Sequence, residues 1–184
     1  MFTKGFNSYA CDGDSISCEV EGFTIVATIK HDECYGLPWK ESDYHGVVSD
    51  WRPKNSKRPG ERILSQDRGS CRFYDWEASM QKAKADGWGS GDGTPGQRAE
   101  RAVQKDFEAL KAWCDDEWCY CGIVLSVSKN GVDLEEHAAS LWGIELNYPD
   151  SDNGYLLEVA NDLISETLEA GKKALGETIK ALTE

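Results

Sequence analysis

The feature that most constrains this fold is a pair of alternating segments separated by only two residues. Residues 16–20 and 23–29 each alternate apolar and polar side chains, and Glu21-Gly22 lies between them. A two-residue turn at this place puts the apolar side chains of both segments on one face of a hairpin. It predicts three facing pairs: Val20 with Phe23, Cys18 with Ile25, and Ile16 with Ala27.

A second hairpin is predicted around Asn130-Gly131, which is the strongest two-residue turn signal in the chain. Residues 118–128 form its first strand. The turn puts Val132 and Leu134 on the same face as the apolar residues of that strand, and a further strand is expected at 141–147. The apolar residues expected on that face of the first strand are Ile123, Leu125 and Val127.

Three helices follow from capping and periodicity. Asp75 can cap a short helix that ends at Gly87, and Thr94 with Gln97 forms a capping-box start for a helix to about Trp113. Residues 87–94, rich in glycine, should form a flexible loop. The last helix opens after residues 151–153 and has a break expected near Gly171 or Gly176. Its predicted inward side chains are Leu156, Ala160, Leu163, Leu168, Leu175, Ile179 and Leu182.

Residues 32–72 lose periodicity and gather prolines and glycines, so we expect a long irregular segment with a short strand near 72–74. At 184 residues the chain is predicted to be one domain, 1–184. The expected fold class is α+β, in which a small antiparallel sheet built from hairpins packs against three helices.

Charge and cysteine content limit where in the cell the protein is expected and which cofactors it can bind. The net charge is -13, with no run of apolar residues that predicts a signal peptide or a membrane span, so we expect a soluble, cytoplasmic protein without membrane contact. Seven cysteines at irregular spacing are read as free thiols, and no cofactor is predicted. A zinc site made of Cys114, Cys119, Cys121 and His31 is a weak alternative, because Cys119 and Cys121 are only one residue apart.

Catalytic motifs are not found. His45 has carboxylates nearby at Asp43 and Asp50, but no nucleophile motif accompanies it, and a loop-stabilising role is favoured. The glycine-rich run at 87–96 precedes a helix but does not follow a strand and contains Asp92, which argues against phosphate binding.

Residues 51–72 differ from the rest of the chain in charge. They carry 7 basic and 2 acidic residues, whereas the remainder carries -18. This segment can neutralise the acidic body, dock a partner or contact phosphates, and these alternatives stay open. The residues predicted to contact a partner are Trp51, Arg52, Lys57, Arg58 and Arg62.

Two stretches carry a resemblance. They are Lys-Arg-Pro-Gly-Glu-Arg with Gly-Ser-Cys-Arg-Phe-Tyr-Asp-Trp within 57–76, and His-Ala-Ala-Ser-Leu-Trp-Gly-Ile-Glu-Leu-Asn-Tyr-Pro from 137. The chain resembles a family of uncharacterised proteins from phages and mobile elements, over most of its length. The resemblance implies only a genomic setting and gives no activity, fold or catalytic residue to carry over. Small acidic proteins from that setting are often inhibitors of host defence, some of which imitate the charge of DNA.

The function expected from the sequence is therefore a non-enzymatic acidic binding protein that engages or inhibits a host protein, with nucleic-acid-binding proteins among the candidate partners. Direct nucleic-acid binding by the chain is less favoured. The alternatives are a metal- or thiol-dependent enzyme that uses the His and Cys residues, and a nucleic-acid binder that uses the basic segment 51–72.

Overall fold

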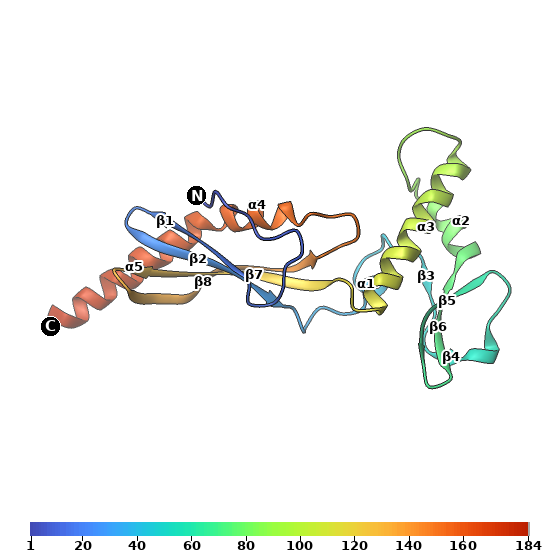
Figure 1. Ribbon diagram of the computed structural model, residues 1–184, viewed down its shortest axis with the longest axis horizontal. Coiled ribbons are helices and arrows are strands. Elements are labelled where there is room, and N and C mark those ends of the chain that lie inside the picture. Colours follow the sequence, from blue (N-terminus) through green and yellow to red (C-terminus); the bar gives the residue numbers. More distant parts are fainter. Residues whose placement is uncertain (184) are drawn as a thin grey trace. The chain divides into compact units, whose positions relative to one another are not determined.

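The computed structural model describes residues 1–183, which combine α-helices with antiparallel β-sheets, as predicted (Figure 1). The chain divides into two compact units, unit 1 of residues 1–34 and 118–184 and unit 2 of residues 35–117. Each unit has its own sheet and its own buried cluster. The prediction from the sequence that the whole chain is one domain stays a prediction.

Unit 1 contains a four-stranded antiparallel sheet in the order β1-β2-β7-β8. The sheet consists of two hairpins, β1–β2 and β7–β8. Pairing of β2 with β7 joins them side by side. Unit 2 is therefore inserted in the chain between two hairpins that share one sheet. The strands are β1 (Ser15–Val20), β2 (Phe23–His31), β7 (Cys119–Lys129) and β8 (Val132–Leu146).

The first hairpin has the register predicted from the sequence, and all three facing pairs are confirmed. Glu21 and Gly22 have φ angles of 52° and 74°. Two consecutive positive φ values define the turn that matches the twist of a two-residue hairpin. The sheet face that carries Phe23, Ile25 and Ala27 is buried, as the alternation requires.

The second hairpin turns at Asn130-Gly131, as predicted, and pairs Lys129 with Val132. Register shifts follow in β7, so that Val127 faces Glu135 rather than Leu134. Val132, which the alternation placed with the core, is 57% exposed. The strand expected at 141–147 is the end of one long strand, β8, because β7 offers pairing partners along its whole length.

Helices α4 (Gly154–Asp162) and α5 (Ile164–Thr183) complete unit 1 and pack on its sheet. The break between them falls at Leu163 rather than near Gly171 or Gly176. Gly171 is buried against the sheet, where an added Cβ would lie 2.8 Å from a methyl group of Val127. Its role is therefore close packing of helix on sheet, not helix termination.

Two of the inward positions expected in the last helix are wrong. Ile179 is 54% exposed and Leu182 is 81% exposed. The final turns of α5 run past the strands of unit 1, as Figure 1 shows, so no sheet surface is left for these side chains to cover.

Unit 2 corrects the expectation that residues 32–72 are irregular. Here β6 (Ser70–Asp75) pairs antiparallel with β3 (Val47–Val48), β4 (Arg52–Pro53) and β5 (Glu61–Asp67). The β5–β6 hairpin turns at Arg68-Gly69, with φ angles of 41° and 89°. A register shift between Ile63 and Ser65 breaks the alternation of β5, which explains why the pattern hid this strand.

The remaining elements of unit 2 are α1 (Pro38–Glu41), a short 3-10 turn (Lys54–Ser56), α2 (Trp76–Ala85) and α3 (Pro95–Cys114). Asp75 caps α2 and Thr94 forms the capping box of α3 with Gln97, both as predicted. Gly87 has a φ of 69° and follows the end of α2, and residues 87–94 contain no helix or strand. None of the helices within residues 1–183 is long and apolar enough to cross a membrane.

Candidate functional site

The five residues predicted to contact a partner lie in unit 2 but do not form one surface. Glu61 and Arg62 are neighbours on β5, and strand alternation sends their side chains to opposite faces. Arg52 and the backbone of Arg58 both bind Glu61, on one face. Arg62 lies on the other face, towards α3, where it binds Gln104.

Arg52 is a structural residue. Its guanidinium lies 2.5 Å from Glu61 Oε1 and 4.6 Å from the ring centre of Phe73. Burial by itself raises the pKa of Glu61, but the hydrogen bond from the Arg58 backbone and the Arg52 guanidinium outweigh burial and hold that pKa below its ordinary value. Arg52 therefore holds a buried carboxylate in place.

Lys57 and Arg58 are exposed, and Trp51 is 43% exposed. The guanidinium of Arg72 lies 4.9 Å from the Trp51 ring and 5.1 Å from the Trp39 ring, so it joins two indoles that the sequence placed in loops. Of the predicted set, Trp51, Lys57 and Arg58 are exposed, whereas Arg52 and Arg62 are half-buried.

A buried polar network surrounds Asp106 on α3. His45 Nδ1 lies 2.7 Å from Asp106 Oδ1, while the Gly46 N–H and the Tyr74 hydroxyl each donate to Oδ2 at 2.8 Å. Burial, followed by the charge of Asp106, raises the pKa of Tyr74, which keeps its hydroxyl a donor. The network fastens the segment before β3 to α3 and β6.

Neither of the carboxylates that are near His45 in the sequence is its partner in this network. Asp43 and Asp50 are near His45 in the chain, but the partner is Asp106, 61 residues away. In the sequence, Asp106 is a polar residue next to the apolar stripe of α3. Periodicity alone does not distinguish such a position from one on the surface. The geometry supports the loop-stabilising role.

The cysteines proposed for metal or thiol chemistry lie in apolar surroundings. Burial raises the pKa of Cys114 to about 11 and that of Cys121 to about 12, so both thiols stay protonated near neutral pH and are poor nucleophiles. Over residues 1–183, no three His, Cys, Asp or Glu side chains gather in a group that could hold a metal ion. The weak zinc alternative of Cys114, Cys119, Cys121 and His31 has no such group to support it.

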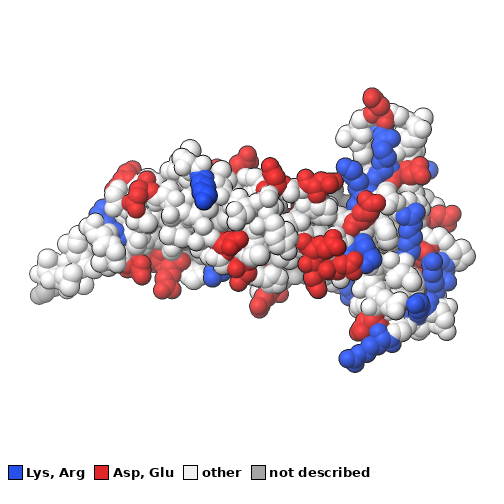
Figure 2. All heavy atoms as spheres, viewed as in Figure 1, with Lys and Arg blue, Asp and Glu red and all other residues white. Residues whose placement is uncertain are grey.

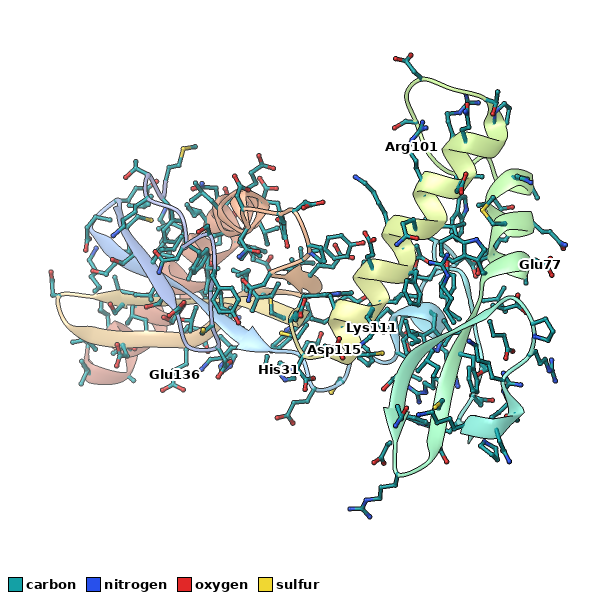
Figure 3. The ribbon with its side chains drawn as sticks, turned by 45° about the vertical axis from the view of Figure 1, so that its right-hand side comes forward. His31, Glu77, Arg101, Lys111, Asp115 and Glu136 are labelled. Atoms are coloured by element: carbon teal, nitrogen blue, oxygen red, sulfur yellow. The ribbon has the colours of Figure 1, made fainter. Side chains whose placement is uncertain are left out.

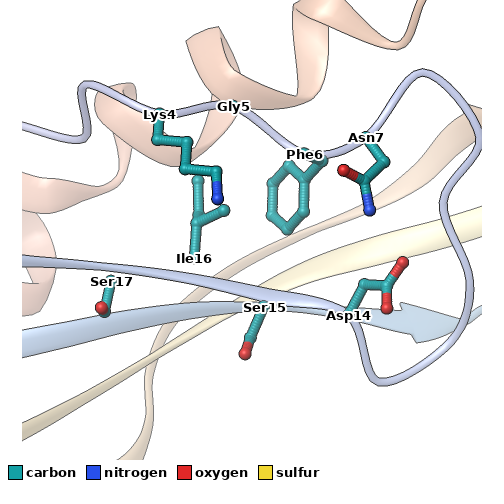
Figure 4. Close-up of a pocket in the computed structure, with 8 residues that line it drawn as sticks. All are labelled: Lys4, Gly5, Phe6, Asn7, Asp14, Ser15, Ile16 and Ser17. Carbon is teal, nitrogen blue, oxygen red and sulfur yellow. The ribbon is translucent and has the colours of Figure 1, made fainter.

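A small hollow in unit 1 lies between the N-terminal segment and β1 (Figure 4). Phe6 and Ile16 supply its apolar part, and Lys4 and Asp14 supply opposite charges. The hydrogen bond from the Phe2 N–H to Asn161 Oδ1, 2.9 Å long, ties this segment to α4. Sequence reasoning missed the hollow because residues 1–14 have no periodic pattern.

The most pronounced feature of unit 1 is its charge. Unit 1 contains 6 basic and 18 acidic residues, a formal charge of -12, whereas unit 2 contains 14 and 15, a formal charge of -1. The positive segment 51–72 is thus balanced by acidic residues of its own unit. Figure 2 shows acidic side chains spread over the surface of unit 1.

Four exposed carboxylates of unit 1 form a row on α4 and α5, at Glu158, Asp162, Glu166 and Glu169. Glu158 and Asp162 share one side of α4, and Glu166 and Glu169 share one side of α5, because each pair is spaced three or four residues apart. Leu156, Ala160 and Leu168 occupy the buried side. We call this outward-facing row the acidic ladder.

The chain matches no protein-family model, no curated protein and no solved structure. The resemblance to phage and mobile-element proteins therefore stays a hypothesis.

Proposed function

We propose that this protein is a non-enzymatic, acidic intracellular binding protein of phage or mobile-element origin, which engages a basic surface of a host protein as a DNA mimic does. The observation that carries the proposal is the segregation of charge, since unit 1 holds -12 of the total of -13. A surface of that sign attracts cationic partners and repels nucleic acid.

The acidic ladder supplies regularity as well as charge. Its carboxylates recur every three or four residues, which corresponds to about 4.5 to 6 Å along a helix axis. A nucleic-acid strand carries one phosphate per ~3.4 Å of axis. A groove lined with Lys and Arg to follow phosphates can therefore meet a comparable row of negative charges on α4 and α5.

The test is capture of partners from a host lysate with the full chain at low salt, followed by elution with duplex DNA. We expect a stoichiometric protein that DNA releases, and an affinity that falls steeply as salt rises, because exposed charges more than a Debye length apart are screened. An affinity that does not change between low and high salt would contradict the proposal.

A matched pair of variants locates the surface. In one, the acidic ladder is neutralised by Glu158→Gln, Asp162→Asn, Glu166→Gln and Glu169→Gln. In the other, four exposed carboxylates of unit 2 are neutralised by Asp43→Asn, Asp67→Asn, Asp86→Asn and Glu117→Gln. Both raise the net charge equally, so we expect the ladder variant alone to lose about tenfold or more in affinity. Equal losses would assign binding to net charge and not to the ladder.

The competing function is nucleic-acid binding through Lys57 and Arg58. A gel shift at low salt with single- and double-stranded DNA separates the two functions, because phosphate contacts weaken as salt rises and as these cations are removed. A shift that is abolished by changing both residues to Ala would favour that function over the one proposed.

A further inference from the structure

Unit 2 contains a cavity that the proposed function does not use and that shares only Arg62 with the predicted partner contacts. It is formed by Arg62 of β5, Trp76 at the start of α2 and one face of α3, and it has a volume of about 480 Å³. Glu100, Arg101 and Lys105 line its α3 side. Figure 3 labels Arg101 on this helix. This volume is within the range of small-molecule sites, ~300–1,000 Å³, and the cavity is a shallow one that is widely open to solvent.

Arg62 is held in a fixed orientation at the wall of the cavity. Its guanidinium carbon lies 3.3 Å from the ring centre of Trp76, and its Nη1 donates to Gln104 Oε1 at 3.0 Å. The ring of Phe107 lies 5.5 Å away. A guanidinium held in this way loses little side-chain entropy when a ligand binds it, and it has N–H groups besides the one that Gln104 accepts.

The charge of the cavity is opposite to that of the protein. Three cations, Arg62, Arg101 and Lys105, face one carboxylate, Glu100, in a chain of net charge -13. Neither solubility nor the binding of a basic partner calls for a positive cavity. A small anion is the ligand that this lining would select.

The side chains that line the cavity indicate which class of anion it binds. A planar cation packed on an indole is a surface on which aromatic bases stack, and neighbouring Arg and Lys side chains bind phosphate. We propose that this cavity binds a mononucleotide, with its base against the Arg62 guanidinium and its phosphate between Arg101 and Lys105. This proposal concerns unit 2 and does not rest on the proposed function of unit 1.

The experiment is calorimetric titration of the full chain with the four common nucleoside monophosphates. The corresponding nucleosides and inorganic phosphate serve as separate probes. We expect at least one nucleotide to bind at one site per chain with a Kd below ~1 mM. The matching nucleoside and inorganic phosphate should each bind at least tenfold more weakly, because each lacks one half of the recognised group.

Substitutions assign the site. Lys105→Gln should weaken nucleotide binding about tenfold through loss of one charged contact, and Arg101→Gln provides a second variant in case the first changes the fold. Lys84→Gln removes an exposed lysine of α2 that does not line the cavity and should leave binding unchanged. The proposal is overturned if no nucleotide saturates the protein, if inorganic phosphate binds as tightly as the nucleotide, or if both cavity variants bind like the Lys84→Gln control.

Discussion

At the scale of single residues, two glycines of α5 show how packing decides what a residue does. Gly171 is buried against Val127, whereas a Cβ at Gly176 would meet nothing within 4 Å. Steric packing therefore restricts the residue at position 171 but not the one at position 176 of the same helix. Replacement by alanine gains about 1 kcal/mol of helix propensity at either position, and only Gly171 opposes that gain with a clash.

We therefore predict that Gly176→Ala raises the free energy of unfolding by about 0.5 to 1 kcal/mol and that Gly171→Ala lowers it by about 1 to 2 kcal/mol. Urea denaturation of the two variants measures both values, and each serves as the control for the other. Equal stabilisation by the two substitutions would mean that α5 does not rest on the sheet at Gly171.

Asp106 illustrates a residue whose importance lies in its partners. It accepts from His45, Gly46 and Tyr74 while its side chain is only 9% exposed. Asp106→Ala should lower the free energy of unfolding by about 3 kcal/mol because three buried donors lose their acceptor, whereas Tyr74→Phe should cost only about 1 kcal/mol. Denaturant unfolding of both variants tests this ratio. Similar costs would show that the tyrosine bond, and not the carboxylate, organises the network.

Glu61 gives a prediction in pH. Its pKa is lower in the folded protein than the ordinary value of 4.5, so the unfolded chain binds its proton more readily. The stability it contributes is fully present above about pH 4.5 and is lost as pH falls through the lowered folded pKa. Glu61→Gln should therefore reduce stability at neutral pH and flatten its decline below pH 4.5. Glu117→Gln, an exposed control, should leave the shape of the stability curve unchanged.

At the scale of elements, the β5–β6 hairpin is the part of the fold that the sequence concealed most fully. Pro53, Pro59 and Gly60 interrupt the pattern before β5, and the register shift within β5 removes the alternation on which strand prediction depends. The turn at Arg68-Gly69 is its one local signal, because glycine at that position accommodates the positive φ.

Hydrogen exchange distinguishes a paired strand from an irregular segment. We predict that amides of 61–67 bonded to β6 exchange at least ~100-fold more slowly than those of 57–60, which belong to no helix or strand. The amides of 23–29 in β2 serve as an internal reference for a paired strand. Uniformly fast exchange across 57–67 would restore the irregular segment expected from the sequence.

At the scale of the whole molecule, the open question is whether the two units unfold together. Leu64 belongs to the buried cluster of unit 2 and Leu125 to that of unit 1, and both are fully buried. Because each cluster is separate, Leu64→Ala should lower protection of the amides of unit 2 by about 2 to 5 kcal/mol and leave those of unit 1 unchanged. Leu125→Ala should do the reverse. Equal losses in both units would establish the single domain predicted from the sequence.

The sequence by itself determined the local structure of this protein. The hairpin at Glu21-Gly22, the turn at Asn130-Gly131 and the caps at Asp75 and Thr94 were predictable because turn and cap residues act on backbone atoms a few residues away. The tertiary structure alone decided what depends on distant residues. It paired His45 with Asp106, packed Arg62 against Trp76, and gathered residues 1–34 and 118–184 into one unit that holds nearly all the net charge, because such arrangements follow from which surfaces meet across the fold and not from spacing along the chain.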